Sequence, residues 1–268
     1  MRPLIAALVM VLCLTSSTAA AIAEGTSEEH WLKRTVLVEE RTSIWCPSCA
    51  EIDPELAIVA KSHGTRIAIV GLHVDDAFEN DASLARIAYQ RQIDNSPYGT
   101  PTFFVDGTKT AEGYDAWSDV QDRILSQENS RGTPEEMAMI LTEGEIQLPT
   151  PEYGQITLMV LEHDKDVPAD VENPGEDVRD RVLVGMKVID SEGNGSEYGD
   201  LDLPELWSVI MIHEPVEGGE PYGVVEISSL EYGENLSFEL LRIVVSCVIL
   251  GAILVYTPAK KSLNTEEE

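Results

Sequence analysis

The chain has 268 residues, enough for one or two domains with a sizeable hydrophobic core. Hydrophobic residues make up 43% of it, as in ordinary folded proteins, which excludes a globally disordered chain. The formal net charge is −30, and because so acidic a surface repels phosphate groups, nucleic acid is excluded as a partner.

Both ends of the chain have the pattern of targeting segments. Residues 1–23 are typical of a cleaved secretory signal peptide, because Arg2 precedes an apolar run that ends in small residues. Residues 239–259 form an apolar stretch of the length that a membrane helix needs, followed by two lysines. The sequence therefore predicts a single-pass cell-membrane protein with its N-terminal domains outside the cytoplasm and a cytoplasmic tail at 260–268. A buried C-terminal helix is the alternative for 239–259.

A pair of cysteines, Cys46 and Cys49, lies where the β-branched run 35–40 gives way to the helical apolar spacing of 50–60. At this spacing the two thiols fall one helical turn apart and can interconvert between dithiol and disulfide. Free N–H groups and the dipole at the start of a helix stabilise a thiolate, so Cys46 is the expected nucleophile and Cys49 the resolving thiol. The pattern favours redox chemistry.

Two other uses of this pair are weaker. A zinc half-site needs a second pair of ligands, and the other cysteines, Cys13 and Cys247, lie in apolar segments. A static disulfide that closes so short a loop adds little stability. We therefore expect catalysis, with no metal and no cofactor.

Strands and helices alternate after the dithiol. Residues 66–74 predict a buried strand, 82–93 a helix, and 114–127 a second amphipathic helix. Between the helices, the strand at 102–105 runs into Asp106-Gly107, a strong signal for a two-residue hairpin. This order implies a mixed sheet flanked by helices.

Two segments of this region are informative together. They are Trp45-Cys46-Pro47-Ser48-Cys49 and Gly99-Thr100-Pro101-Thr102. Through them, residues 33–128 resemble a thioredoxin-fold domain. The resemblance implies a thiol–disulfide oxidoreductase with the two cysteines as catalytic residues and Pro101 in the cis form opposite them. It also implies that Trp45, Thr100 and Pro101 contact an extended substrate strand.

The same resemblance gives Glu40 a role. Thioredoxins carry a buried carboxylate six residues before the first cysteine, and counting back from Cys46 reaches Glu40. Burial raises the pKa of a carboxyl group, which would fit Glu40 to relay the proton of Cys49 as a third catalytic residue. A surface charge at a strand end is the alternative. Thioredoxin has Gly-Pro where this chain has Pro47-Ser48, and this dipeptide tunes the redox potential, so the direction of transfer stays open.

The pattern breaks near residues 129–134, which predicts a boundary between domains at 24–130 and 131–238. The second region has short apolar or alternating runs separated by acidic turns, which predicts an all-β, sandwich-like domain. This architecture is similar to secreted thioredoxin-like proteins of the outer-membrane-protein-related kind. The predicted fold class is therefore an α/β thioredoxin-like domain, then an all-β domain, then a C-terminal transmembrane helix.

The predicted function is a membrane-anchored extracytoplasmic thiol–disulfide oxidoreductase. Its expected partners are cysteine-containing exported proteins and a membrane electron carrier. The alternative is a surface-anchored binding protein that uses the thioredoxin fold as a scaffold, since a fold alone does not establish an activity. A peroxidase-like thiol enzyme is a weaker third option, because no basic residue stands beside Cys46 in the sequence.

Overall fold

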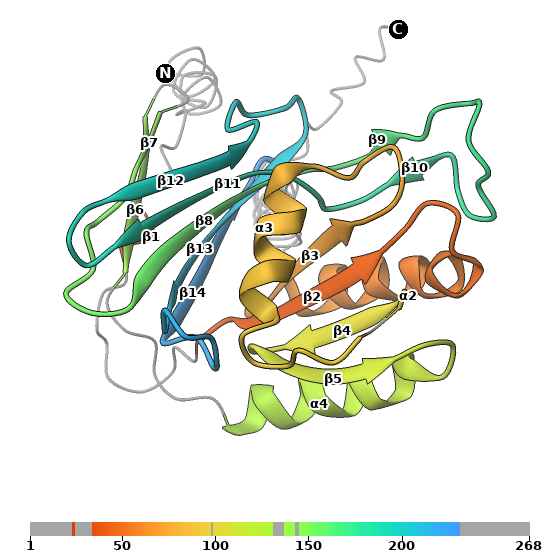
Figure 1. Cartoon of the computed structure of the whole chain (residues 1–268), viewed down its shortest axis with the longest axis horizontal. Helices are drawn as coiled ribbons and strands as arrows, with labels where there is room; N and C mark the ends of the chain where they lie inside the picture. Colours follow the sequence, from red (N-terminus) through yellow and green to blue (C-terminus); the bar gives the residue numbers. More distant parts are fainter. Residues whose placement is uncertain (1–22, 25–33, 98, 131–136, 143–144, 231–268) are drawn as a thin grey trace, which may run out of the picture. The chain divides into compact units, whose positions relative to one another are not determined.

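The centre of the fold is one nine-stranded mixed β-sheet with helices on both faces (Figure 1). The structure, a computed structural model, describes residues 23–24, 34–97, 99–130, 137–142 and 145–230. The predicted boundary region near 131 falls in a part that the structure does not describe.

The elements between residues 36 and 130 include the helices that pack on the sheet and the segment with the dithiol. They are β2 (Val36–Thr42), α2 (Pro47–His63), a 3-10 turn (Gly64–Arg66), β3 (Ile67–His73), α3 (Asp81–Gln90), β4 (Thr102–Val105), β5 (Thr108–Glu112) and α4 (Ala116–Ser130). β2 pairs in parallel with β3 and antiparallel with β4. Asp106 and Gly107 both have positive φ and form the tight turn between β4 and β5, which confirms the hairpin predicted from this pair.

The other described elements are strands. They are β1 (Ala23–Glu24), β6 (Ala138–Thr142), β7 (Glu145–Gln147), β8 (Gln155–Glu162), β9 (Lys165–Asp166), β10 (Val178–Arg179), β11 (Val182–Asp190), β12 (Gly195–Gly199), β13 (Trp207–Glu214) and β14 (Gly223–Ser228). β1, β6 and β7 form a small sheet, and β9 and β10 form an antiparallel pair.

The large sheet has the strand order β14-β13-β8-β11-β3-β2-β4-β5, with β12 paired to β11 beside this path. Its two halves meet where β11 lies parallel to β3, with Val182 opposite Gly71. The N–H group of Gly71 donates to the carbonyl of Arg181 at 2.9 Å. The strands after residue 150 therefore extend the sheet that contains β2 and β3.

The fold class predicted from the sequence is wrong on this point. The region after residue 130 forms no separate sandwich in the part of the chain that the structure describes, because β8, β11, β13 and β14 belong to the same sheet as β2. The physical reason is that β3 would be an exposed edge of an isolated α/β domain, and β11 covers this edge by pairing with it.

Among the described residues, no helix is long and apolar enough to cross a membrane. This finding corrects the predicted fold class and location: a C-terminal transmembrane helix and a single-pass anchor are not supported. The segment 239–259, on which the prediction rested, lies outside the described residues, as do residues 1–22 of the predicted signal peptide and the tail 260–268.

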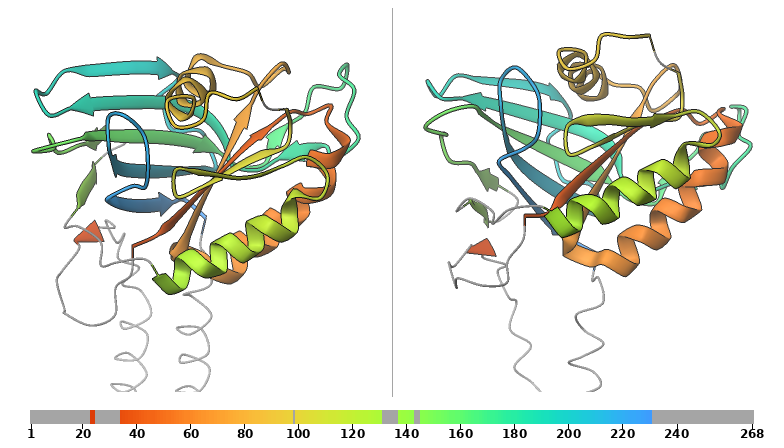
Figure 2. Two further views of the ribbon diagram at one scale, coloured as in Figure 1. Left: turned by 60° about the horizontal axis from the view of Figure 1, so that its bottom comes forward. Right: turned by 90° about the horizontal axis from the view of Figure 1, so that it is seen from below.

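Two hydrophobic clusters cover opposite faces of β2 and β3. On one face, α2 and α4 pack over a cluster that includes Val36 and Val38, and Figure 2 shows these helices side by side. On the other face, α3 packs over a cluster that includes Leu37. Because side chains alternate along a strand, Glu40 and Thr42 share the α2 face with Val36 and Val38.

A buried ion network lies on the α3 face. Arg86 of α3 is 2% exposed, and its Nε lies 2.5 Å from Oε1 of Glu39 in β2. Its Nη1 lies 2.7 Å from Oε1 of Glu214 in β13, which also accepts a hydrogen bond from Thr157 Oγ1 at 2.6 Å. The guanidinium group lies over the Tyr89 ring, 4.5 Å from its centroid. One arginine thus links two strands that are not neighbours in the sheet.

Candidate active site

The dithiol lies at the junction between β2 and α2. Cys46 is the residue just before the first helical residue of α2, and Pro47 follows at the position where a missing N–H costs nothing. The Sγ atom of Cys46 accepts a hydrogen bond from the N–H group of Cys49 at 3.2 Å. The two cysteines form a disulfide, with Cα atoms 5.3 Å apart. The first turn of α2 therefore directs an N–H group and its positive dipole end at Cys46.

The two sulfur atoms are shielded, whereas the residue before them is open. Cys46 is 3% exposed and Cys49 is 1% exposed, but Trp45 is 44% exposed. The Trp45 indole donates through Nε1 to the carbonyl of Asp75 at 3.0 Å. The loop after β3 therefore holds in place the turn that presents the dithiol.

The second segment predicted to contact substrate leads into β4. The peptide bond between Thr100 and Pro101 is cis, as the resemblance implies. In the antiparallel pairing of β2 with β4, Thr102 lies opposite Arg41. Pro101 therefore lies beside the carboxyl end of β2, where the chain turns toward Cys46. The structure brings both predicted segments to the same end of the sheet.

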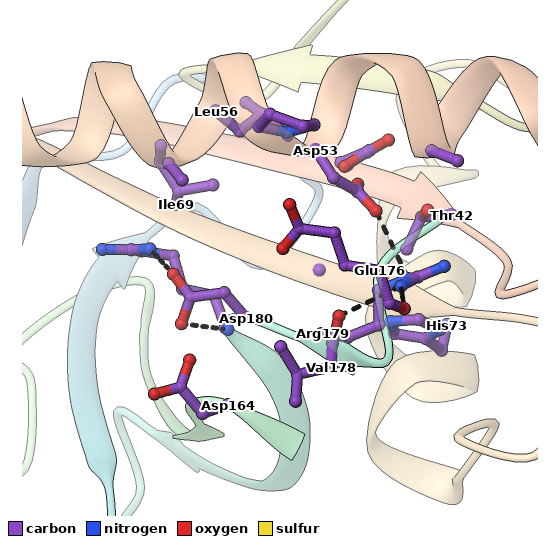
Figure 3. Close-up of a pocket in the computed structure, with 16 residues that line it drawn as sticks. Thr42, Asp53, Leu56, Ile69, His73, Asp164, Glu176, Val178, Arg179 and Asp180 are labelled. Atoms are coloured by element: carbon purple, nitrogen blue, oxygen red, sulfur yellow. Dashed lines mark hydrogen bonds and ion pairs between the residues drawn. The ribbon is translucent and has the colours of Figure 1, made fainter. Parts of the chain in front are cut away.

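A cavity of about 200 Å³ lies beneath α2. Its walls come from α2, from β2 and β3, and from the segment between Asp164 and Arg181 (Figure 3). Its charged and titratable lining residues are Glu40, Asp53, His73, Asp164, Glu176, Arg179, Asp180 and Arg181. Although this lining is acidic, no group of three or more His, Cys, Asp or Glu side chains among the described residues is arranged to hold a metal ion.

Glu40 is a buried lining residue of this cavity. It is 2% exposed, so it is not a surface charge. Its Oε1 atom has no hydrogen-bond partner among the described residues, while its carboxyl group is hydrogen-bonded to the Thr42 side chain. Burial first, and then the negative charge of Asp53, raise the pKa of Glu40 well above the ordinary glutamate value, against the opposing charge of Arg179. Glu40 therefore keeps its proton to a higher pH than an ordinary glutamate does.

The connection between β9 and β10 forms a wall of the site that the sequence analysis missed. Gly175 packs so closely on α2 that a Cβ atom at this position would lie 3.0 Å from Cβ of Ala50. Arg179 donates through Nη2 to the carbonyl of Ile44 at 3.4 Å, and its Nε lies 3.3 Å from Oδ2 of Asp53. A segment far from the dithiol in sequence thus contacts residues just before and just after the two cysteines.

A sequence signal exists for one of these residues. Asp53 follows Cys49 by four positions, so helical spacing alone places it on the same face of α2. Arg179 has no comparable signal, because only the pairing of strands across the sheet brings it to the cavity.

His163, Asp180 and Ser208 form another ordered array. Nδ1 of His163 is hydrogen-bonded to Asp180, and Nε2 lies 2.8 Å from Oγ of Ser208. Ser208 is 0% exposed in β13, which pairs with β8 on one side and β14 on the other. Because no substrate can reach its hydroxyl group there, we interpret this array as a polar network that supports the sheet.

Comparison with known proteins adds a similarity of fold. No family model and no curated protein matches the chain. Among solved structures, HBP35 of Porphyromonas gingivalis matches with a TM-score of 0.54 and 17% identity, over 75% of this chain and 76% of that chain. A crystal structure of a protein from Agrobacterium tumefaciens matches with a TM-score of 0.47 and 16% identity, over 76% of this chain and 98% of that chain. The first similarity shows a shared fold and nothing about activity, and the second is too distant to support an inference.

Proposed function

We propose that this chain is a thiol–disulfide oxidoreductase that acts through Cys46 and Cys49 and is related to thioredoxin-fold enzymes. One observation carries the proposal: a disulfide-forming cysteine pair occupies the start of α2, at the end of the sheet where the cis Pro101 also lies. Cysteine-containing proteins are the proposed substrates, with Trp45 and Thr100 in contact with them beside the proline.

In the first step, the Cys46 thiolate attacks one sulfur of a substrate disulfide. A bond forms between Sγ of Cys46 and that sulfur, while the substrate S–S bond breaks and releases its other sulfur as a thiolate, which takes up a proton. The N–H group of Cys49 and the positive end of the α2 dipole stabilise the attacking thiolate.

In the second step, Cys49 resolves the mixed disulfide. Its proton passes to the carboxylate of Glu40, and the Cys49 thiolate then attacks Sγ of Cys46 and releases the second substrate sulfur. Two electrons thus pass from the dithiol to the substrate. The reverse sequence transfers a disulfide to a dithiol substrate, and for repeated turnover a second dithiol or disulfide must restore the starting state.

The proposal is tested by titrating the full chain against mixtures of reduced and oxidised dithiothreitol. The redox state is measured by mass spectrometry of the alkylated peptide that contains Cys46 and Cys49. We expect a reversible two-electron transition. Its midpoint reduction potential should be about −270 mV for a reductant or about −120 mV for an oxidant. A pair that cannot be reduced and reoxidised reversibly would contradict the proposal and favour the alternative, a binding protein that uses the fold as a scaffold.

Replacing Glu40 by glutamine is expected to slow resolution of the mixed disulfide by about a hundredfold, because Cys49 loses its base. The wild-type rate should rise with pH as Glu40 ionises, and this rise should be absent in Glu40→Gln. Stopped-flow fluorescence of Trp45 after mixing with glutathione disulfide measures the rate. Glu55→Gln is the control, since it removes the same charge from an exposed position on α2. An unchanged pH profile in Glu40→Gln would contradict the proton relay.

The same variant has a second readout. Because the pKa of Glu40 is raised in the folded chain, the folded state binds more protons than the unfolded state above the ordinary glutamate value. The stability that Glu40 contributes is therefore fully present at low pH and is lost as the pH rises through its raised pKa. Urea unfolding should show that Glu40→Gln is more stable than the wild type at high pH.

A further inference from the structure

Two carboxylates line the cavity beneath α2. Glu40 belongs to β2. Asp53, which Figure 3 labels, belongs to α2. Asp53 lies one helical turn after Cys49 on the same face of α2. Its negative charge is the largest influence, after burial, that raises the pKa of Glu40. The two groups therefore interact.

Arg179 contacts these carboxylates unequally. Its Nε lies 3.3 Å from Oδ2 of Asp53, whereas Oε1 of Glu40 has no hydrogen-bond partner among the described residues. The side chain of Asp53 is 29% exposed, but Glu40 is only 2% exposed. An ion pair and partial hydration favour the charged form of Asp53, while deep burial favours the neutral form of Glu40.

The other charged groups at this end of the cavity act on Asp53. Burial raises the pKa of Asp53, and Arg179 opposes this rise most strongly, followed by His73 of β3. Glu176 and Asp180, from the segment around β10, raise the pKa of Asp53 further. The ion pair with Arg179 and the greater exposure of Asp53 favour a negative charge on Asp53, beside Glu40.

We propose that Asp53 and Arg179 are positioning residues for the proton transfer: the negative charge of Asp53 makes Glu40 a stronger base for the Cys49 proton, and the positive charge of Arg179, paired with Asp53, opposes this effect. The catalytic consequence rests on the proposed function. Arg179 limits the influence of Asp53, because a positive charge favours the ionised form of Glu40. The strands added after residue 150 therefore supply a residue that tunes the dithiol chemistry.

The step is balanced within the protein and its bound substrate. The S–H bond of Cys49 breaks, and its proton goes to Glu40. The Cys49 sulfur bonds to Sγ of Cys46, while the bond between Cys46 and the substrate sulfur breaks. That sulfur leaves with the electron pair of the broken bond and takes the proton from Glu40. No outside oxidant or reductant enters this step.

The proposal is tested by following the carboxyl carbon NMR signal of Glu40 against pH in the full chain. The signal is assigned by its loss in Glu40→Gln. Asp53→Asn should lower the pKa of Glu40, because a neighbouring negative charge is removed. Arg179→Gln should move it in the opposite direction. Opposite shifts from two neighbouring substitutions are not expected from a general disturbance of packing.

Two controls keep the test decisive. Glu55→Gln removes a charge from the exposed side of the same helix and should leave the Glu40 titration unmoved. Arg179→Lys retains the positive charge and should keep the pKa of Glu40 near the wild-type value, which separates the charge from the packing of the arginine. A Glu40 titration unchanged by Asp53→Asn, or lowered by Arg179→Gln, would overturn the proposal.

A kinetic measurement separates this inference from the proposed function. The pH midpoint for resolution of the glutathione mixed disulfide should fall in Asp53→Asn and rise in Arg179→Gln. If the NMR titrations shift but the wild-type and variant midpoints are equal, the role of Asp53 and Arg179 in proton transfer is overturned while the oxidoreductase function stands. If the wild-type chain does not exchange with glutathione disulfide at all, the proposed function itself fails.

Discussion

Replacing Cys46 by alanine is expected to slow thiol–disulfide exchange by at least about a thousandfold, because the attacking sulfur is removed. Sγ of Cys46 accepts a hydrogen bond from the N–H group of Cys49 in the first turn of α2. Cys46 also follows the exposed Trp45. The remaining thiol, Cys49, lies one turn inside α2, away from the helix start that stabilises a thiolate, so it is a poor replacement for the nucleophile. The reduced full chain is mixed with glutathione disulfide and quenched with acid, and the adducts are located by mass spectrometry.

Cys49→Ala is the matched control for this experiment, since it also removes one thiol but leaves the nucleophile in place. We expect Cys49→Ala to form the mixed disulfide on Cys46 and to accumulate it, because nothing resolves it. Cys46→Ala should acquire almost no adduct at Cys49 in the same time. Equal labelling of the two variants would contradict the assigned roles, and no labelling of either would point to a scaffold.

The parts of the site that depend on one short segment could be predicted from the sequence. The apolar run before Cys46 and the helical spacing after it predict a strand that turns into a helix, and the structure has β2 and α2 there. The Asp106-Gly107 turn is another local feature, because two successive positive φ values require residues that tolerate them. Local chemistry was sufficient in both places.

The parts that depend on strand pairing could not be predicted. The runs between 155 and 228 are short and apolar or alternating, as strands are, but such a pattern does not say which strand lies alongside. The pairing of β11 with β3 rests on one short stretch around Gly71 and Val182, which no local pattern indicates. Arg179 reaches the cavity only because of that pairing. The sequence therefore predicted a separate all-β sandwich where the strands belong to one mixed sheet, and it missed a residue of the site.

The burial of Glu40 shows the same division. Its distance from Cys46 along the chain suggested a role. Its neighbour Glu39 has the same charge and is also buried, but it lies on the other face of the sheet. Glu39 faces α3 and pairs with Arg86, whereas Glu40 faces α2 and lines the cavity. The alternation of side chains separates the two carboxylates, and only the position of the helices shows which one lines the cavity beneath α2.

Replacing Arg86 by methionine is expected to lower the free energy of unfolding by about 3–5 kcal/mol, because it leaves buried charges without their partner. Arg86 forms an ion pair with each of Glu39 and Glu214, both of which are 0% exposed. Methionine keeps much of the apolar volume of the side chain, so the loss reports mainly on charge. Urea unfolding followed by far-UV circular dichroism measures it.

Arg91→Met is the matched control, since Arg91 is an exposed arginine just after the last residue of α3 and its replacement should cost less than about 0.5 kcal/mol. A second comparison adds Glu39→Gln and Glu214→Gln to Arg86→Met. If the unpaired charges cause the loss, the triple variant should recover part of it, because neutral amides are cheaper to bury than carboxylates. An Arg86→Met variant as stable as Arg91→Met would mean that the network does not hold β2 and β13 together. The apolar clusters alone would then account for the continuity of the sheet.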